Sequence, residues 1–416
     1  MENRERVVIT GLGIVSPLGQ DVEAFWQNLL AGKSGISSID GFDTAEHSVK
    51  IAGMVRGWDG EALLGKKEAR RMDRFCQFAV AAAEQAVRDA GLHLETADRE
   101  RIGVYVGSGI GGIGTLIQND GLLRDRGPGR VSPTLVPMMI ANMAAAQISI
   151  RLQTLGPTLA PVTACSIGNT AIGEAFRMIR CGGADAIIAG GAEAAVTGLS
   201  LASFANATAL SARNDAPEAA SRPFDADRDG FVMAEGAGIV VLESLSHASR
   251  RGARIYAEVV GYGATSDAYH VVATHPEGRG AYRAMRLALE EAGLRPEDVD
   301  VISAHATSTE AGDRSEAMAI RRLYEGIPAG KRPAVTANKS MTGHMLGAAG
   351  GAEAIALALS LQEGIIPPTI NLAALDPACE MDVVANEARP APGMRIGLSN
   401  SFGFGGHNAV IALRRI

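Results

Sequence analysis

Short runs rich in β-branched residues alternate with alanine-rich stretches along the whole chain, and this alternation restricts the possible folds more than any other feature. In the first part the runs are RVVITGLG, RIGVYVGSG, ADAIIAGGAE and GAGIVVLE; in the second they are IYAEVVGYG, VDVISAHA, AVTANKS and NAVIALRRI. Strands that alternate with helices form βαβ units, in which helices cover a mostly parallel or mixed sheet. The sequence therefore predicts an α/β protein with buried sheets.

The two parts of the chain also resemble each other. RVVITGLGIVSPLG has the same pattern as IYAEVVGYGATSDA, and PVTACSIGNTAIGEAFRMIRCG has the same pattern as AVTANKSMTGHMLGAAGGAEAIALAL. Each member of the second pair reads as a strand, a turn of small residues and an alanine-rich helix. We predict two similar halves, 1–255 and 256–416, that share one core. The alternative is that α/β chains imitate themselves through composition alone.

Charge and cysteine content exclude several classes of protein. The net charge is -7 and no basic block offsets it, which argues against nucleic-acid binding. The four cysteines form no CxxC pair and no zinc-ligand spacing, so we expect neither a metal site nor a disulfide framework. Such a chain fits a reducing compartment, and we predict a cytoplasmic protein.

Two apolar segments could suggest targeting or membrane insertion. The N-terminal MENRERVVITGLGIV has a short apolar part broken by glycine, which indicates a first strand rather than a signal peptide. Residues 131–150 carry no charge, but Pro133, Pro137, Asn142 and Gln147 interrupt them. We predict a buried interior helix with its leading loop, and no membrane contact.

Cys165 lies in the stretch PVTACSIGNT, where an expected strand gives way to a helical pattern over 167–179. At a helix start, free backbone N–H groups and the helix dipole favour a thiolate and lower its pKa. The same N–H groups can bind a developing oxyanion. A buried structural cysteine explains this stretch equally well.

Three of the eight histidines lie among turns and small residues. His305 follows the expected strand VDVIS, His344 lies in KSMTGHMLGAAGG, and His407 lies in SFGFGGHNAV. A histidine at a strand end, followed by Thr307 and Thr309, is typical of a functional site. The remaining histidines occur in charged or loop segments, where we expect them to be solvated: His47, His93, His247, His270 and His275.

Five motifs in a fixed order carry a resemblance to a known family. TACSIG, SRPFDADRDGFVMAEGAG, HATSTEAGD, NKSMTGHMLGAAGG and NSFGFGGHN resemble the β-ketoacyl-acyl-carrier-protein synthases of the thiolase superfamily. The likeness covers nearly the whole chain and is greatest to elongating type II enzymes and to polyketide ketosynthases. It implies a thiolase-like duplicated fold of five αβαβα layers with two mixed sheets, and an active site where the halves meet.

The resemblance also implies an activity, the decarboxylating Claisen condensation of an acyltransferase. Cys165 would accept an acyl chain from a carrier-protein thioester. Malonyl carrier protein would then lose carbon dioxide, and the resulting enolate would attack the acyl carbonyl. His305 and His344 would stabilise the enolate oxygen through their N–H groups. The pathway, fatty acid or specialised polyketide and polyene synthesis, remains open at this point.

Further site residues are implied in the same way. Lys339 would supply positive charge and hold the histidine geometry, although an ordinary ion pair with Glu353 or Asp313 is an alternative. Phe404 would gate the sulfur, and its N–H, with that of Cys165, would form the oxyanion hole. Substrate contacts would come from hydroxyl groups that bind pantetheine and from apolar side chains that line the acyl pocket: Thr307, Thr309, Ile110 and Phe204.

The chain departs from the family pattern at two positions. Where the pattern usually reads HGT, this chain has Ala306 between His305 and Thr307, and we expect the methyl group to restrict the turn or narrow the malonyl entrance. His407 stands where the last motif more often reads GGTN. We expect His407 to affect substrate range rather than activity itself.

The implied partner is an acyl carrier protein, which brings its own phosphopantetheine, so we expect no other cofactor. Carrier proteins are acidic and so is this chain, and docking therefore needs a local basic patch. The candidates are Lys67, Arg70 and Arg71 in GKKEARRMDRF, and Arg130, although a solvated helix face is an equally good interpretation. The family forms dimers, so we expect a homodimer or a heterodimer with a homologous subunit, with the uncharged segment before Cys165 at the interface.

Other interpretations fit less well. GIGGIG at 109–114 matches a dinucleotide fingerprint, but no acidic residue follows at the required distance. DADRDG at 225–230 begins like a calcium loop, but its twelfth position is Gly236, so a buried salt-bridge cluster or a turn is expected instead. A non-decarboxylating thiolase would have a second cysteine where this chain has GFGGHN. A non-catalytic chain-length-factor subunit would lack the nucleophile.

Overall fold

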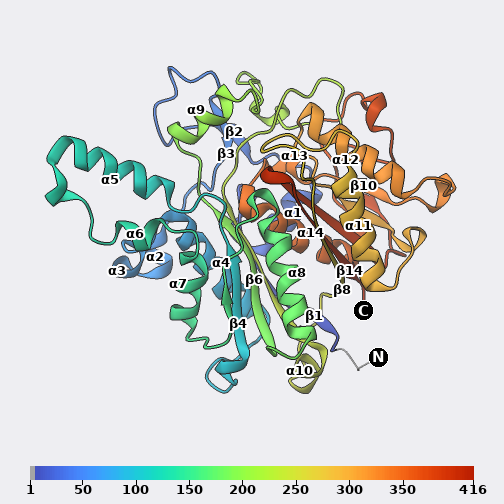
Figure 1. The fold of residues 1–416 in the computed structure, drawn as a ribbon, viewed down its shortest axis with the longest axis horizontal. Helices are drawn as coiled ribbons and strands as arrows, with labels where there is room; N and C mark the ends of the chain where they lie inside the picture. Colours follow the sequence, from blue (N-terminus) through green and yellow to red (C-terminus); the bar gives the residue numbers. More distant parts are fainter. Residues whose placement is uncertain (1–4) are drawn as a thin grey trace.

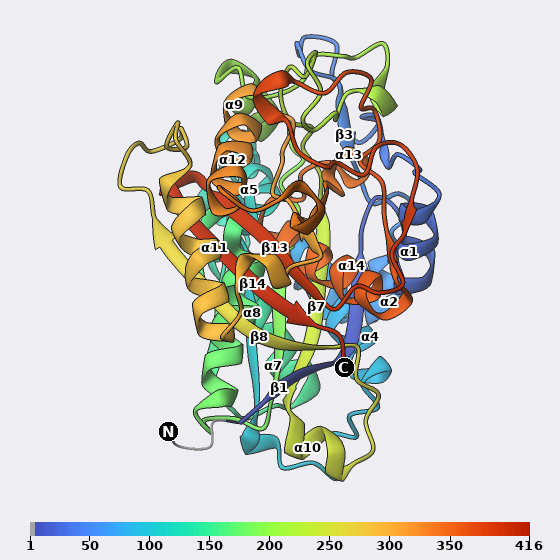
Figure 2. The same ribbon diagram turned by 90° about the vertical axis from the view of Figure 1, so that its right-hand side faces the viewer.

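The strands of the protein fall into two groups with the same internal order. The computed structural model describes residues 5–416 (Figures 1 and 2). In spatial order the first group is β5 (Thr158–Leu159), β4 (Ile102–Gly107), β6 (Ala186–Glu193), β7 (Gly236–Ser244) and β1 (Val7–Val15). The second is β10 (Ala334–Thr336), β9 (Val301–Ser303), β13 (Ile396–Gly403), β14 (His407–Arg414) and β8 (Ala257–Ser266).

Each group follows the order third, second, fourth, fifth, first when its strands are counted along the chain. In both groups, taken in spatial order, the first three strands run parallel to one another. The third and fourth strands pair antiparallel, and so do the fourth and fifth. Mixed sheets were predicted, but as two separate ones. The structure instead joins them, because β1 pairs antiparallel with β8 over Val7–Val259, Val8–Glu258 and Ile9–Ala257.

Helices form three layers around these strands (Figures 1 and 2). Between the two groups lie α8 (Ile167–Arg180) and α14 (Ala349–Glu363), which contact strands of both. The outer face of the first group is covered by α4 (Arg74–Asp89) and α7 (Met143–Leu152), and that of the second by α11 (Arg279–Ala292) and α12 (Glu310–Leu323). The predicted five layers are therefore present, with three apolar cores between them.

Smaller elements complete the chain. They are α1 (Val22–Leu30), β2 (Ile36–Ser38), β3 (Ile51–Gly53), α2 (Gly60–Leu64), α3 (Lys66–Ala69), α5 (Ile113–Arg126), α6 (Leu135–Met139), α9 (Gly198–Asn206), α10 (Leu245–Arg250), α13 (Lys339–Thr342), β11 (Ile365–Ile366) and β12 (Arg389–Pro390). In Figure 1, α5 extends away from the body on the same side as α3.

Paired glycines let a helix lie directly on the first strand of each group. An added Cβ at Gly13 would lie 1.9 Å from the carbonyl oxygen of Ala82 in α4. An added Cβ at Gly263 would lie 1.9 Å from that of Ala284 in α11. The glycines of GLG in β1 and of GYG in β8 thus both allow close packing of a helix on the strand. This shared packing explains why the two segments have similar sequences.

The prediction of a buried interior helix in 131–150 is wrong for most of that segment. Only Ala144, Ala145 and Ile148 of α7 are buried, whereas Val136 is 58% and Ile150 62% exposed. These three residues pack on the first group of strands, whereas Val136 and Ile150 face outward. Within residues 5–416, no helix combines the length and the hydropathy that crossing a bilayer requires.

The Gly263 contact predicts a large cost for one added methyl group. Gly263→Ala should lower the free energy of unfolding by about 2 to 3 kcal/mol, because backbone atoms of α11 must move. The control is Gly121→Ala in α5, where an added Cβ meets nothing within 4 Å. That change should raise stability by up to about 1 kcal/mol through helix propensity. Urea unfolding measures both, and equal effects would contradict the packing argument.

Candidate active site

Cys165 lies at the start of α8, as predicted. It is the middle residue of a single 3₁₀ turn, Ala164–Ser166, that leads into the helix. Ala164 has a left-handed backbone with φ +50°, which costs a non-glycine residue about 1 kcal/mol or more. The turn is held by Ser166, whose N–H and Oγ both donate to the carbonyl oxygen of Thr163, at 3.1 and 2.8 Å.

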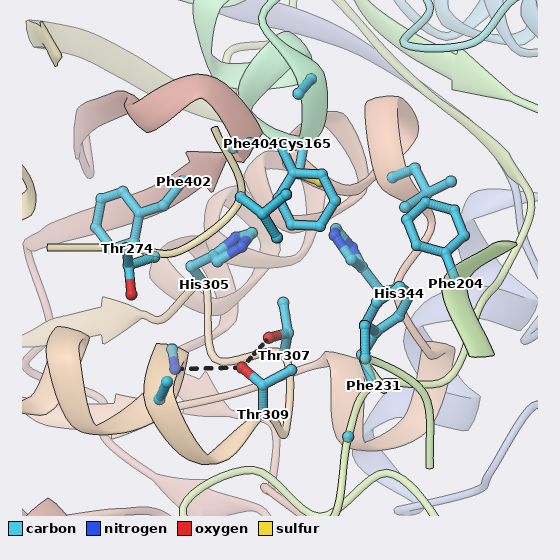
Figure 3. A pocket seen from close by; sticks show the side chains of 18 of the residues that line it. Cys165, Phe204, Phe231, Thr274, His305, Thr307, Thr309, His344, Phe402 and Phe404 are labelled. Carbon is cyan, nitrogen blue, oxygen red and sulfur yellow. Dashed lines mark hydrogen bonds between the residues drawn. The ribbon is translucent and has the colours of Figure 1, made fainter. Parts of the chain in front are cut away.

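A cavity of about 590 Å³ brings most of the predicted site residues together. Figure 3 shows the labelled side chains around it. Its walls contain Cys165, His305, His344, Phe404, Thr307, Thr309, Ile110 and Phe204. These residues come from both halves of the chain, so the cavity lies where the halves meet.

The two predicted histidines face the same space from different segments. His305 follows β9, and His344 follows α13. Their ring centroids are 5.5 Å apart and the rings are nearly perpendicular, at 88°. In Figure 3 the rings approach the region of Cys165 and Phe404 from opposite sides. Neither Nδ1 atom has a hydrogen-bond partner among residues 5–416.

Both imidazoles are neutral near pH 7. Burial lowers the pKa of His305 well below its ordinary value, and Lys339 and His344 lower it further. Burial and Lys339 likewise lower the pKa of His344. A neutral imidazole keeps one N–H to donate, as the stabilisation of an enolate oxygen requires.

Lys339 lies behind the cavity wall rather than in it. Its side chain is 1% exposed and forms an ion pair with Glu353. Asp313, the other ion-pair partner considered for Lys339, instead lies with its Oδ2 3.5 Å from Nε of Arg228. Burial raises the pKa of Glu353 to about 7, while Lys339 lowers it. Lys339 therefore acts on the site through its field and through this buried pair.

The expected low pKa of Cys165 is not what the structure gives. Burial raises the pKa of the thiol to about 12 although Lys339 lowers it; Glu193 contributes to the rise, and the N–H groups of Phe404 and Cys165 oppose it. The thiol borders a deep cavity lined mainly by apolar groups, where a charge loses most of its hydration. The helix start is present, but desolvation outweighs it, so the resting thiol is protonated.

Phe404 occupies the position that a gate requires. It begins a 3₁₀ turn, Phe404–Gly406, and its side chain is 38% exposed at the cavity, 6.2 Å from the Phe204 ring. Gly405 has φ +81°, a conformation that favours glycine. The 3₁₀ turns that carry Cys165 and Phe404 are in contact, and the N–H of Phe404 lowers the pKa of the Cys165 thiol, as an oxyanion hole requires.

The turn after His305 is strained at the departure from the family pattern. Ala306 has φ +24° and is buried, and Ser308 has φ +73°. The hydroxyl of Thr309 accepts from the N–H of Gly312 and caps α12, and it lies 3.2 Å from that of Thr307. His407 is exposed and does not line the cavity, so no effect on substrate range follows from the structure.

Two buried glutamates were not anticipated from the sequence. Glu316 in α12 accepts from the N–H groups of His305 and Ala306, at 2.9 and 2.7 Å, and from Asn400 Nδ2 at 2.9 Å. It thereby fixes the strained turn. Glu193 ends β6 and lines the cavity. An acidic residue ending the otherwise apolar run AIIAGGAE was the one available signal for Glu193.

The other sequence interpretations have clear outcomes. Asp225, the first residue of the calcium-like stretch, is buried, pairs with Arg222 at 2.9 Å and accepts from backbone N–H groups, as a salt-bridge cluster should. The docking candidates are all exposed, Lys67, Arg70 and Arg71 in and after α3 and Arg130 beyond α5. Arg70 pairs with Glu61 at 2.9 Å. Their role remains a prediction.

The lowered histidine pKa values predict a loss of stability in acid. Below about pH 6.5 the unfolded chain protonates both histidines, whereas the folded chain does not until much lower pH. The free energy of unfolding should therefore fall by about 1 kcal/mol per histidine between pH 6.5 and 5.5. Urea unfolding of the double variant His305→Gln, His344→Gln should show about 2 kcal/mol less loss over this interval, and an equal loss would contradict the assignment.

Comparisons with known proteins agree with the geometry. Residues 4–248 match the family described as "Beta-ketoacyl synthase, N-terminal domain", and residues 256–373 match its C-terminal domain. The chain is 50% identical to "3-oxoacyl-[acyl-carrier-protein] synthase 2" of Synechocystis sp. (99% of this chain, 98% of the relative) and of Staphylococcus aureus strain COL (100% and 99%).

Solved structures give the same result. "The ishigamide ketosynthase/chain length factor" matches with a TM-score of 0.91 and 39% identity, covering 99% of this chain and 100% of the other. A β-ketoacyl synthase from Burkholderia phymatum STM815 matches with a TM-score of 0.90 and 35% sequence identity. The match covers 99% of this chain and 100% of the other. The fold is that of the thiolase-like ketosynthases, and the chain belongs to the β-ketoacyl synthase family.

Proposed function

We propose that the protein is a β-ketoacyl-acyl-carrier-protein synthase, which extends an acyl chain by decarboxylating condensation with malonyl carrier protein. The observation that carries this proposal is the shared cavity, in which one thiol faces two neutral imidazoles. The relatives that are 50% identical over the whole chain bear the name of this activity.

The first step loads the enzyme. The Cys165 sulfur attacks the thioester carbonyl, and the N–H groups of Cys165 and Phe404 bind the oxyanion. The carbon–sulfur bond to pantetheine then breaks, and the departing thiolate takes the proton that the Cys165 thiol loses. Because burial raises the pKa of Cys165 to about 12, the proton leaves during the attack and not before it.

The second step makes the carbon–carbon bond. The malonyl group loses its carboxylate as carbon dioxide, and the electron pair of the broken bond forms an enolate, whose oxygen accepts from the N–H groups of His305 and His344. The enolate carbon attacks the acyl carbonyl. The bond to the Cys165 sulfur breaks, and the resulting thiolate takes up one proton from solvent, which balances the negative charge that the malonyl carboxylate brought. The chemistry calls for no cofactor beyond the pantetheine that the carrier protein brings.

A second subunit would cover an exposed apolar surface on α5, α6, α7 and β5. Its side chains are Leu116, Leu123, Val136, Ile140, Ile150, Leu155, Leu159 and Val162. Large exposed apolar patches mark interfaces. We propose that this surface joins two copies of the chain, with the uncharged segment 131–150 at its centre. It also suits a homologous subunit.

The second candidate function is a ketosynthase of a specialised polyketide or polyene pathway. Two neighbours at a TM-score of 0.91 favour it, the ishigamide ketosynthase/chain length factor and a type II polyketide ketosynthase bound to its acyl-carrier protein. Within residues 5–416, Cys165 is the one cysteine that lines the cavity, which argues against a thiolase with a cysteine base. The presence of Cys165 argues against a non-catalytic subunit.

Acyl loading tests the proposal directly. Incubation with acyl carrier proteins of increasing chain length should add one acyl group to Cys165, detected by intact and peptide mass, and the chain lengths accepted should separate the two pathways. Cys165→Ala should abolish the adduct. Cys181→Ala, which removes an exposed cysteine, should leave it unchanged. An adduct that survives in Cys165→Ala would refute the assignment.

Charge reversal tests the docking surface. Arg70→Glu with Arg71→Glu should raise KM for carrier-bound substrate about tenfold or more, because it repels an acidic partner, and should spare small thioesters. The matched control is Arg283→Glu with Arg321→Glu, two exposed arginines on α11 and α12. Equal effects on both kinds of substrate, or from both pairs of variants, would exclude docking at α3.

A further inference from the structure

The Glu193 side chain is a buried carboxylate that the proposed mechanism does not use. It ends β6, it is fully buried, and it lines the cavity that contains Cys165. Within residues 5–416 it forms no ion pair. A buried carboxylate without a cationic partner is costly, so its presence beside a nucleophile calls for a reason.

Burial raises the pKa of Glu193, and four hydrogen bonds lower it by stabilising the ionised form. Its Oε1 accepts from Ser108 Oγ at 2.8 Å and from the N–H of Ile110 at 3.1 Å. Its Oε2 accepts from the N–H groups of Gly109 and Gly347 at 2.8 and 3.2 Å. Three of the four partners are backbone N–H groups, which can only donate, and the Ser108 hydroxyl already accepts from the N–H of Gly111 at 3.1 Å. These surroundings favour the carboxylate over the protonated acid.

Two glycines are required for this arrangement. An added Cβ at Gly109 or at Gly347 would lie 2.9 Å from Glu193 Oε2. Both positions therefore leave space for a carboxylate beside the cavity wall. The glycines and the backbone N–H groups around Glu193 together form a binding site for its carboxylate.

The sulfur of Cys165 senses opposite charges. Lys339 lowers the pKa of its thiol, and Glu193, with a smaller effect, raises it. His305 and His344 are influenced by Lys339, and Glu193 is not among the causes of their shifts. The histidine side of the cavity is thus the side that suits an anion. The side formed by Gly109 and Ile110, where Glu193 lies, disfavours one.

We propose that Glu193 is a specificity-determining residue that keeps carboxylate-bearing acyl groups out of the end of the cavity into which Cys165 loads its acyl chain. This inference rests on the proposed condensation, in which two thioesters compete for one thiol. The uncharged acyl group must be transferred to Cys165, whereas the malonyl group must not. A fixed negative charge beside the acyl-binding end of the cavity repels the malonyl carboxylate but not the uncharged acyl group. This discrimination does not depend on the length of the acyl chain.

The size of the effect follows from Coulomb's law. Two like charges about 6 Å apart, at an effective permittivity of about 20, change a rate by on the order of a hundredfold. Glu193→Gln removes the charge and keeps the shape. Ser108→Ala removes one hydrogen bond to Glu193 and leaves the charge, so it is the matched control for a loosened cavity wall.

Alkylation at Cys165 measures the local field without any substrate. The probes are iodoacetate, which is anionic, and iodoacetamide, which is neutral and of similar size, with modification read at Cys165 by peptide mass. The ratio of the iodoacetate rate to the iodoacetamide rate cancels the effect of the thiol pKa. Glu193→Gln should raise this ratio about tenfold or more, and Ser108→Ala should leave it unchanged.

An unchanged ratio in folded Glu193→Gln, or an equal rise in Ser108→Ala, would overturn the proposal. If Glu193→Gln does not fold, the wild-type protein still gives a test. Its ratio should be about tenfold or more below that of N-acetylcysteinamide, a thiol that carries no charge of its own, and equal ratios would overturn the proposal.

Small thioesters extend the test to acyl transfer. Wild type should load butyryl N-acetylcysteamine onto Cys165 much faster than the succinyl analogue, which carries a carboxylate, and Glu193→Gln should narrow the difference about tenfold. Equal loading of both by wild type would overturn the proposal. If neither thioester nor any acyl carrier protein acylates Cys165, the condensation itself fails, while the alkylation ratio still reports on Glu193.

Discussion

The contact between α8 and α14 is the constraint on which the rest of the structure depends. An added Cβ at Gly168 would lie 2.3 Å from the backbone nitrogen of Gly351, so the two helices touch backbone to backbone between the sheets. Their leading turns are consequently neighbours. Each turn has a left-handed residue, Ala164 at φ +50° and Leu346 at φ +48°. The nucleophile and the segment that carries His344 therefore meet because the two repeats pack together.

Burial controls the chemistry of this meeting point. It keeps both imidazoles neutral and the thiol protonated, and the nearby ionic groups adjust these states without reversing them. Lys339 is held by Glu353 behind the cavity wall, and Glu193 accepts hydrogen bonds from the N–H groups of Gly109, Ile110 and Gly347. The site thus has fixed charges at its edges and neutral reacting groups at its centre. That arrangement suits a reaction whose charges appear only along its course.

The sequence revealed the fold and most of the cavity because both depend on local patterns. The alternation of strands and helices predicted the α/β fold. The resemblance carried by the five ordered motifs implied that Cys165, His305, His344 and Phe404 share one site, and all four line the same cavity. The thiol pKa was predicted wrongly because a helix start can be read from neighbours in sequence, whereas desolvation depends on the packing of distant segments. Glu316 was missed for the same reason, since its partners lie across a loop. The segment 131–150 was misplaced because an apolar surface and an apolar core have the same composition.

The protonated state of Cys165 has a consequence for the survival of the enzyme. Peroxide oxidises thiolates, and a cysteine that stays protonated reacts slowly with it. A thiol whose pKa is raised to about 12 by burial is therefore protected while it waits for a substrate. The desolvation that delays ionisation until an acyl group arrives also makes the empty enzyme resistant to oxidative damage.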